Sequence, residues 1–135
     1  MAFEPTEQVQ RHLSNEAITW LTTVTPSGRP APRPVWFYWD GTGLTTYSQP
    51  DAAKLRHIEA NDQVSLHFNQ NAAGGDVVVI SGRARRVPDA PLPTKNAVYH
   101  EKYATLVQQA GFTAEFFDSF SVAIRITPER VWAMP

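Results

Sequence analysis

A strand that is apolar on both of its faces limits what this chain can fold into. Residues 34–39 read Pro-Val-Trp-Phe-Tyr-Trp and contain no charged side chain. Because successive side chains of a β-strand point to opposite faces, a strand of this kind has no face that favours water. We expect one face to pack on the protein core and the other to face a ligand or a partner subunit.

A possible phosphate-binding element follows this strand. The expected strand 44–48 leads through Pro50 and Asp51 into a helix that carries Lys54 in its first turn. The free backbone amides at a helix N-terminus attract anions, and a lysine charge beside them would add to this attraction. Lys54 can also be a solvated residue on a surface helix, and the spacing alone leaves both interpretations open.

The remaining hydrophobic pattern predicts short antiparallel strands joined mostly by hairpins. Three helices are expected to begin at the capping side chains Thr6, Asp51 and Thr94, and a short Phe-rich helix follows the last of them. Gly82 is expected to mark a bulge or a sharp bend, and residues 127–130 to interrupt the last strand. The main strands are expected at residues 17–25, 34–39, 44–48, 64–69, 77–87 and 121–126.

These elements predict an α+β architecture. Six short antiparallel strands enclose too little space for a pore, so we expect them to close into a small filled barrel with inserted helices. The chain has 135 residues, of which 42% are hydrophobic and 19% charged, as is typical of an ordinary globular protein. We therefore expect a single domain that spans residues 1–135.

Charge and composition argue against several classes of partner. The net charge of −1 is unlike that of nucleic-acid-binding proteins, and the absence of cysteine excludes disulfides and thiolate metal sites. No apolar run approaches the ~18–20 residues that a membrane helix needs, and the N-terminus has no signal-peptide pattern. We expect a soluble, cytoplasmic protein that binds neither nucleic acid nor a membrane.

The sequence contains no recognisable catalytic constellation. Its four histidines lack metal-ligand spacing, and no Gly-x-Ser-x-Gly nucleophile motif occurs. Metal ligands are therefore predicted to be absent, and the catalytic residues cannot be named from the sequence. If the protein is an enzyme, a bound cofactor would supply its chemistry.

Three motifs give the chain a family resemblance. They read Thr-Val-Thr-Pro-Ser-Gly-Arg-Pro at residues 23–30, Pro-Val-Trp-Phe at 34–37 and Tyr-Ser-Gln-Pro-Asp-Ala-Ala-Lys at 47–54. The chain resembles the split-barrel flavoproteins of the pyridoxamine-phosphate-oxidase-like superfamily. Within that superfamily it is similar to the actinobacterial reductases that depend on coenzyme F420, a deazaflavin. The resemblance runs from about residue 16 to residue 132.

The resemblance implies a homodimer with a cofactor at the subunit interface. The phosphate-binding lysine of the family matches Lys54, and the backbone of residues 34–36 would lie along the tricyclic ring of the cofactor. Relatives carry an arginine just before this lysine, whereas here Ala53 stands at that position and Arg56 follows two residues later. The predicted cofactor-binding residues are Pro34, Val35, Trp36, Tyr47, Ser48, Gln49, Lys54 and Arg56.

The function implied is that of an F420-dependent oxidoreductase. Reduced deazaflavin would transfer a hydride to an electron-poor, small organic substrate, and Tyr47 is a candidate proton donor. One alternative is an FMN-dependent oxidoreductase on the same fold, and another is a non-catalytic barrel that binds a flavin or a tetrapyrrole. A basic segment formed by Arg83, Arg85 and Arg86 can either protect an exposed strand edge or attract an anionic cofactor tail.

Overall fold

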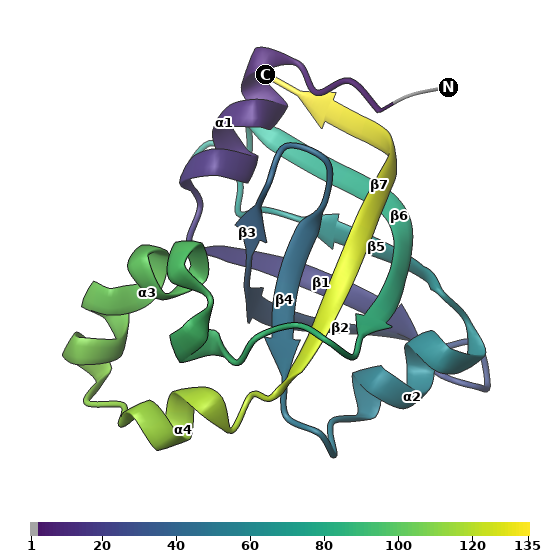
Figure 1. Cartoon of the computed structure of the whole chain (residues 1–135). Coiled ribbons are helices and arrows are strands. Elements are labelled where there is room, and N and C mark those ends of the chain that lie inside the picture. The colour runs from purple at the N-terminus through teal and green to yellow at the C-terminus, as the bar shows by residue number, and fades with distance from the viewer. Residues whose placement is uncertain (1–2) are drawn as a thin grey trace.

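A computed structural model describes residues 3–135 and contains one strongly curled antiparallel sheet (Figure 1). The strand order is β2-β1-β5-β6-β7-β4-β3, so the predicted α+β barrel is confirmed with seven strands in place of six. The strands are β1 Ile18–Val24, β2 Pro30–Trp36, β3 Tyr38–Trp39, β4 Leu44–Ser48, β5 Gln63–His67, β6 Val77–Val87 and β7 Val122–Met134. The helices are α1 Glu7–Asn15, α2 Ala53–Ala60, α3 Ala97–Ala110 and α4 Ala114–Asp118, with a 3-10 turn at Pro93–Lys95.

The seventh strand arises because the expected strand 34–39 breaks at Phe37. The backbone N–H of Phe37 donates to the hydroxyl of Tyr103 at 2.7 Å, and its carbonyl accepts from the ammonium of Lys102 at 2.7 Å. Helix α3 thus satisfies both backbone groups that a continuous sheet would have paired. The prediction of one unbroken strand over 34–39 was therefore wrong, and β3 pairs with β4 instead.

The core lies inside the curl of the sheet. Alternate residues of the strands point inward, as Leu21 of β1, Leu66 of β5 and Ile80 of β6 do. Val9 and Leu13 of α1 are fully buried against this core, as their spacing predicts. The fold therefore places its apolar residues where the alternating pattern of the sequence puts them.

Strand β7 is continuous, so the predicted interruption at residues 127–130 is wrong. Its pairing with β6 shifts between Ser81 and Gly82: Ser81 lies opposite Arg130 and Gly82 opposite Pro128. A side chain at Gly82 would clash with the Thr127 carbonyl oxygen. The predicted bulge at Gly82 is thus confirmed, and it lets β7 carry a proline without ending the strand.

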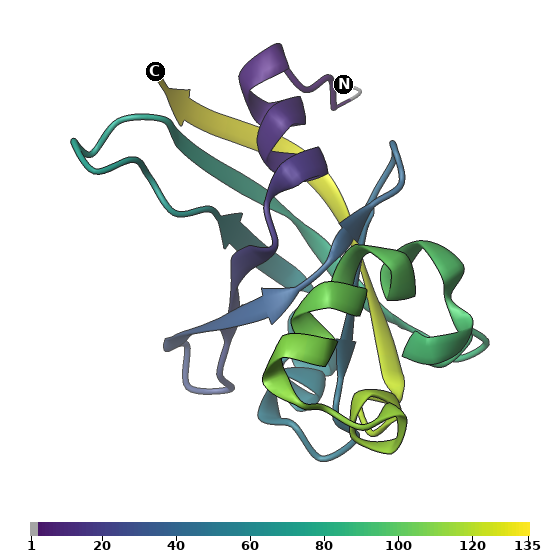
Figure 2. The same cartoon turned by 90° about the vertical axis from the view of Figure 1, so that its left-hand side faces the viewer.

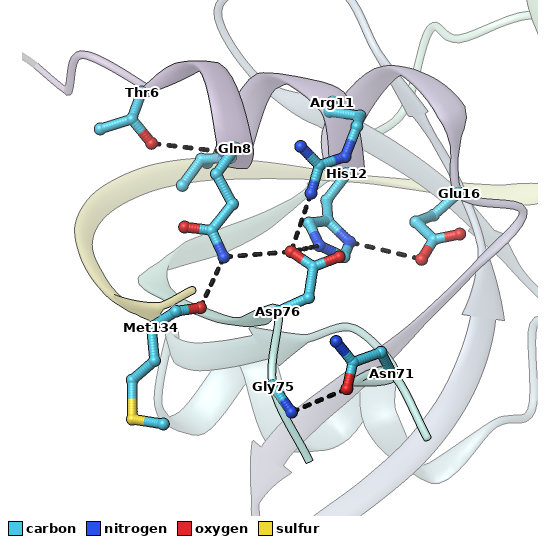
Figure 3. Close-up of polar contacts among 10 residues, drawn as sticks. Thr6, Gln8, Arg11, His12, Glu16, Asn71, Gly75, Asp76 and Met134 are labelled. Atoms are coloured by element: carbon cyan, nitrogen blue, oxygen red, sulfur yellow. Dashed lines mark hydrogen bonds and ion pairs between the residues drawn. The ribbon is translucent and has the colours of Figure 1, made fainter. Parts of the chain in front are cut away.

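A group of polar contacts joins helix α1 to the β5–β6 turn and to the C-terminal end of β7 (Figure 3). The carboxylate of Asp76 lies 3.0 Å from Nε2 of the buried His12 and 2.8 Å from the guanidinium of Arg11. Gln8 donates to the same carboxylate and to the Met134 carbonyl oxygen at the end of β7. These contacts fix the helix, the β5–β6 turn and the C-terminal strand to one another.

The other helices gather at the opposite end of the barrel. In Figure 1, α2 and α4 flank the end of β4, and α3 lies next to α4. Figure 2 shows α3 and α4 on one side of the barrel and the β5–β6 turn on the other. No helix in residues 3–135 is both long and apolar enough to cross a bilayer.

Two predicted helix starts are corrected. Helix α2 begins after Ala52, which offers no capping side chain, so Asp51 is not its cap. Thr94 lies in the 3-10 turn, and Asn96 caps α3 by accepting from the Tyr99 amide. Thr94 instead bonds Asp118 of α4 through its amide at 2.9 Å and its hydroxyl at 2.6 Å.

Candidate functional site

Two adjoining cavities lie at the end of the barrel where α2, α3 and α4 gather. The first, here called the aromatic chamber, has a volume of about 330 Å³. The second, here called the polar pocket, has a volume of about 300 Å³. Pro34 and Lys54 line both cavities, so the two spaces meet at these residues. The chamber is lined by Ile18, Pro34, Val35, Trp36, Tyr47, Lys54, Tyr99, Phe112, Phe116, Phe117 and Phe120, and the pocket by Thr23, Ala31, Arg33, Pro34, Ala52, Ala53, Lys54 and His57.

The structure brings five of the eight predicted cofactor-binding residues to these cavities. They are Pro34, Val35, Trp36, Tyr47 and Lys54. They come from the end of β2, from β4 and from the first turn of α2, which converge at this end of the barrel. Their role in binding a cofactor stays a prediction.

The other three predicted residues line neither cavity. Ser48 is buried, and its hydroxyl donates to the backbone oxygen of Gln49 at 2.9 Å. Gln49 is half-buried in the loop before α2, and Arg56 points to solvent from the exposed side of that helix. A direct ligand role for these side chains would need a movement of the loop or of a side chain.

Lys54 lies in an environment that favours an anion. Burial is the main cause that lowers the pKa of its ammonium group, and the positive charge of Arg33 lowers this pKa further. A bound anion would offset both effects. Because Ala52 cannot cap α2, the backbone amides of Ala53 and Lys54 also remain available to an anion, whereas that of Leu55 bonds the Ala52 carbonyl oxygen.

Two residues of the polar pocket were missed by the sequence analysis. Arg33 projects from β2, and His57 lies one helical turn after Lys54 on α2. The Nδ1 atom of His57 lies 2.8 Å from the hydroxyl of the buried Thr23. Nothing in the local sequence pairs residue 33 with residue 57, because only the curl of the sheet brings β2 against α2.

The aromatic wall of the chamber was also missed as a site. Phe112, Phe116, Phe117 and Phe120 come from α4 and the residues around it, a segment that the sequence analysis identified only as Phe-rich. Phe112 and Phe116 are 39% and 42% exposed, which is unusual for side chains of this size. The cluster of phenylalanines after Gly111 was the sequence signal from which this wall could have been predicted.

The hydroxyl of Tyr47 is occupied outside the chamber. It donates to the Pro91 carbonyl oxygen at 2.7 Å and accepts from the side-chain amide of Asn96 at 3.0 Å. Burial raises the pKa of Tyr47 above its usual value. The ring of Tyr47 lines the chamber, but this geometry gives no support to the proton-donor role suggested from sequence.

The basic segment of β6 lies away from both cavities. Arg83 pairs with Asp62 at 2.8 Å and with Glu129 at 3.3 Å, and Arg86 lies 3.6 Å from Glu59. Strand β6 is an inner strand, paired with β5 over residues 79–83 and with β7 along its length. Arg83 is therefore paired on both sides, whereas Arg85 and Arg86 lie past the end of the pairing with β5, on an edge that their charges can protect, and none of the three lines the polar pocket.

Residues 3–135 hold no group of three or more histidine or acidic side chains arranged to bind a metal. The site offers instead two cations, helix amides, a histidine and a wall of aromatic rings. Such a combination can bind a molecule with a flat ring system and a negatively charged group.

Comparison with solved structures gives the same fold at low sequence identity. The chain is 24% identical to a protein named F420 reductase, with a TM-score of 0.69 and coverage of 96% of this chain and 98% of that one. It is 21% identical to an FAD-binding protein from Mesorhizobium loti, with a TM-score of 0.64 and coverage of 90% and 86%. It is 19% identical to HutZ, the heme storage protein from Vibrio cholerae, with a TM-score of 0.63 and coverage of 99% and 96%.

The three similar proteins have different ligands in their names, so at these identities the likeness establishes the fold alone. The family assignment has a separate basis. The family model described as pyridoxamine 5'-phosphate oxidase matches residues 5–135, which is nearly the whole chain. The chain therefore belongs to the pyridoxamine 5'-phosphate oxidase family.

Proposed function

We propose that this protein is an oxidoreductase that binds a flavin-type cofactor, and that the cofactor is the deazaflavin F420. One observation carries the proposal: Lys54 joins a polar pocket that contains Arg33 and His57 to a chamber walled by aromatic rings. A cofactor with a phosphate tail on a flat tricyclic ring would place its phosphate in the polar pocket and its ring in the aromatic chamber. The similarity to a protein named F420 reductase supports the choice of deazaflavin.

The roles of the residues follow from their positions. Lys54 and Arg33 would hold the phosphate by charge-assisted hydrogen bonds, together with the first amides of α2. The backbone of residues 34–36 would support the ring, and the phenylalanines would keep water from the reacting atoms. The bound cofactor would supply the hydride, so the protein needs to orient the reactants more than to provide acids and bases.

A second candidate cofactor is FMN. The phosphate of FMN is a terminal group with three free oxygens, whereas the phosphate of F420 is linked on both sides. The presence of Arg33 and His57 beside Lys54 gives the pocket enough donors for a terminal phosphate. A heme-binding barrel without catalysis is the third possibility, supported by the likeness to a heme storage protein.

We also propose that the protein acts as a homodimer and that the outer face of the sheet contributes to its interface; the expectation that the cofactor lies at the subunit interface stays a prediction. Trp20, His67, Val79 and Trp132 lie directly opposite one another on four neighbouring strands, so their side chains share one face. The rings of Trp20 and His67 are stacked with centroids 6.0 Å apart, and Trp132 is 58% exposed. A second copy that covered this row would bury aromatic surface of the kind found in interface cores.

Side-by-side titration of the purified protein with F420, FMN and heme tests the cofactor proposal. Replacing Lys54 with Ala should weaken binding of the true cofactor by about 1.5–3 kcal/mol, or roughly 10- to 150-fold in Kd. Lys95→Ala, which removes an exposed lysine from outside both cavities, is the matched control. Equal affinity of the wild type and Lys54→Ala for every ligand that binds would refute the proposed site, and tight binding of heme alone would refute the redox assignment.

A further inference from the structure

We infer that the aromatic chamber selects an uncharged, planar substrate, and that it has no place for a substrate that carries its own phosphate. The inference rests on the proposed function, because it assumes that the polar pocket holds the phosphate of the cofactor, that the cofactor ring lies along residues 34–36 at one side of the chamber, and that the substrate stacks on this ring. It concerns the substrate. It implies that this chain does not act on pyridoxamine 5'-phosphate, the substrate after which its family is named.

The lining of the chamber contains a single charged side chain. This is Lys54, and it stands where the chamber meets the polar pocket. The remaining lining residues are aliphatic or aromatic, and the hydroxyl of Tyr47 is already bonded to the Pro91 carbonyl and to Asn96. With Lys54 paired to the cofactor phosphate, a substrate whose carboxylate, phosphate or ammonium group lies among these residues would bury that charge without a partner, at a large cost in free energy.

The cations of the site are grouped to hold one anion only. Arg33, Lys54 and His57 all line the polar pocket, and neither Arg33 nor His57 lines the chamber. When a cofactor phosphate occupies this pocket, no cation remains for a second phosphate. Pyridoxamine 5'-phosphate, which carries both an amine and a phosphate, therefore lacks partners in the chamber for both of its charges.

The rim of the chamber has apolar surface that a flat ligand would cover. The ring of Phe116 lies 4.8 Å from that of Phe112 and 5.5 Å from that of Phe120, and these three rings form a continuous row. Phe112 lies 6.3 Å from Trp36, so the row reaches from α4 to strand β2. A planar molecule between this row and the strand could stack on rings at several points.

The chamber is held open by contacts outside it. Asp118, at the end of α4, bonds both the amide and the hydroxyl of Thr94, and Thr113 caps the start of the same helix by accepting from the Phe116 amide. On the other side, Trp36 is stacked on Tyr103 with centroids 4.4 Å apart. Because both walls are fixed, the chamber would favour a ligand that is flat before it binds.

A matched pair of probes tests the inference by calorimetry: naphthalene-2-carboxamide, which is uncharged, and naphthalene-2-carboxylate, which has nearly the same shape. The wild-type protein with saturating cofactor should bind the carboxamide about tenfold or more tightly than the carboxylate, because the chamber cannot pair the negative charge. Pyridoxamine 5'-phosphate should not displace the carboxamide. Equal affinity for the two probes, or displacement by pyridoxamine 5'-phosphate, would overturn the inference.

Two substitutions at Phe116 locate the binding. Phe116→Leu should weaken carboxamide binding about two- to tenfold, because it removes ring stacking from the rim. Phe116→Arg should reverse the preference, so that the carboxylate binds more tightly than the carboxamide. Val98→Arg is the control, since Val98 is 59% exposed on α3 and does not line the chamber. Binding that neither Phe116 substitution changes would show that the probes occupy another place.

The failure of this inference can be told apart from the failure of the proposed function. If no flavin-type cofactor binds, the same titrations of Lys54→Ala, which lacks the one charged side chain of the chamber lining, still measure the charge preference of the chamber. If the cofactor binds and competes with the carboxamide, the chamber holds only the cofactor ring, and the substrate inference is wrong while the cofactor proposal stands. Loss of cofactor binding in Lys54→Ala with unchanged carboxamide binding would support both.

Discussion

The indole ring of Trp36 lies flat on the phenol ring of Tyr103, with the centroids 4.4 Å apart and the planes inclined by 4°. The hydroxyl of the same tyrosine accepts from the backbone N–H of Phe37 and lies within hydrogen-bond distance of the carbonyl oxygens of Ala17 and Phe37. One side chain of α3 therefore fixes both the break between β2 and β3 and the ring that forms one wall of the chamber.

The hydroxyl of Tyr103 should contribute strongly to stability. Tyr103→Phe keeps the stacked ring but leaves the buried N–H of Phe37 without an acceptor, and we expect the free energy of unfolding to fall by about 1–3 kcal/mol. Urea denaturation measures this change. Tyr38→Phe, whose hydroxyl makes no hydrogen bond with residues 3–135, should change the stability by less than about 0.5 kcal/mol. Similar losses in both variants would mean that the bond at the strand break has little effect.

Arg33 should bind the cofactor phosphate together with Lys54. Arg33→Gln should weaken cofactor binding by about 1.5–3 kcal/mol, the range for hydrogen bonds to charged groups, and should reduce the dependence of Kd on salt. Titrations at low and high ionic strength measure both effects. The control is Arg29→Gln, because Arg29 lies on the turn before β2 and lines neither cavity. If both substitutions act equally, general surface charge rather than the polar pocket attracts the cofactor.

The contacts of Asp76 should make stability depend on pH in the acid range. The hydrogen bonds from His12 and Gln8 are the main causes that lower the pKa of Asp76 to about 2, from a usual value of 3.8. Since this folded-state pKa lies below the unfolded one, the stabilisation is complete above about pH 4 and is lost as the pH falls through about 2.

Asp76→Asn should therefore be less stable than the wild type at neutral pH, and the two proteins should converge near pH 2. Chemical denaturation at several pH values measures the difference. Asp89→Asn removes a carboxylate from an exposed position and should leave the pH profile unchanged. A constant difference between the wild type and Asp76→Asn across this range would contradict the assignment of the acid dependence to Asp76.

The outer face of the sheet should carry the dimer. Trp132→Glu places a charge at the β7 end of the row formed with Trp20, His67 and Val79, and should raise the dissociation constant of the dimer by about 30-fold or more. Sedimentation velocity over a range of concentrations measures the change. Val98→Glu alters a side chain of nearly equal exposure, 59% against 58%, on a different surface. A wild-type protein that stays monomeric at high concentration would refute the proposed interface.

Several features of this protein could be predicted from local sequence. The alternating apolar residues of β1 and β5 predict strands with one buried face, and Gly82 predicts the bulge, because a side chain at that position would clash with the neighbouring strand. Lys54 could be named because the turn before α2 and the position of the lysine are both local in sequence. The break at Phe37 could not be predicted, because its two partners lie more than sixty residues later in the chain.

The sequence by itself determined most of the strands, the barrel and the lysine at the start of α2, since the alternation of apolar residues depends on neighbouring residues. Only the tertiary structure decided what surrounds that lysine. Arg33 and His57 meet it because the sheet curls, and Phe116 lines the same chamber because Asp118 fixes α4 to Thr94. A binding site made by segments far apart in the chain depends on packing geometry, which no local pattern of residues encodes.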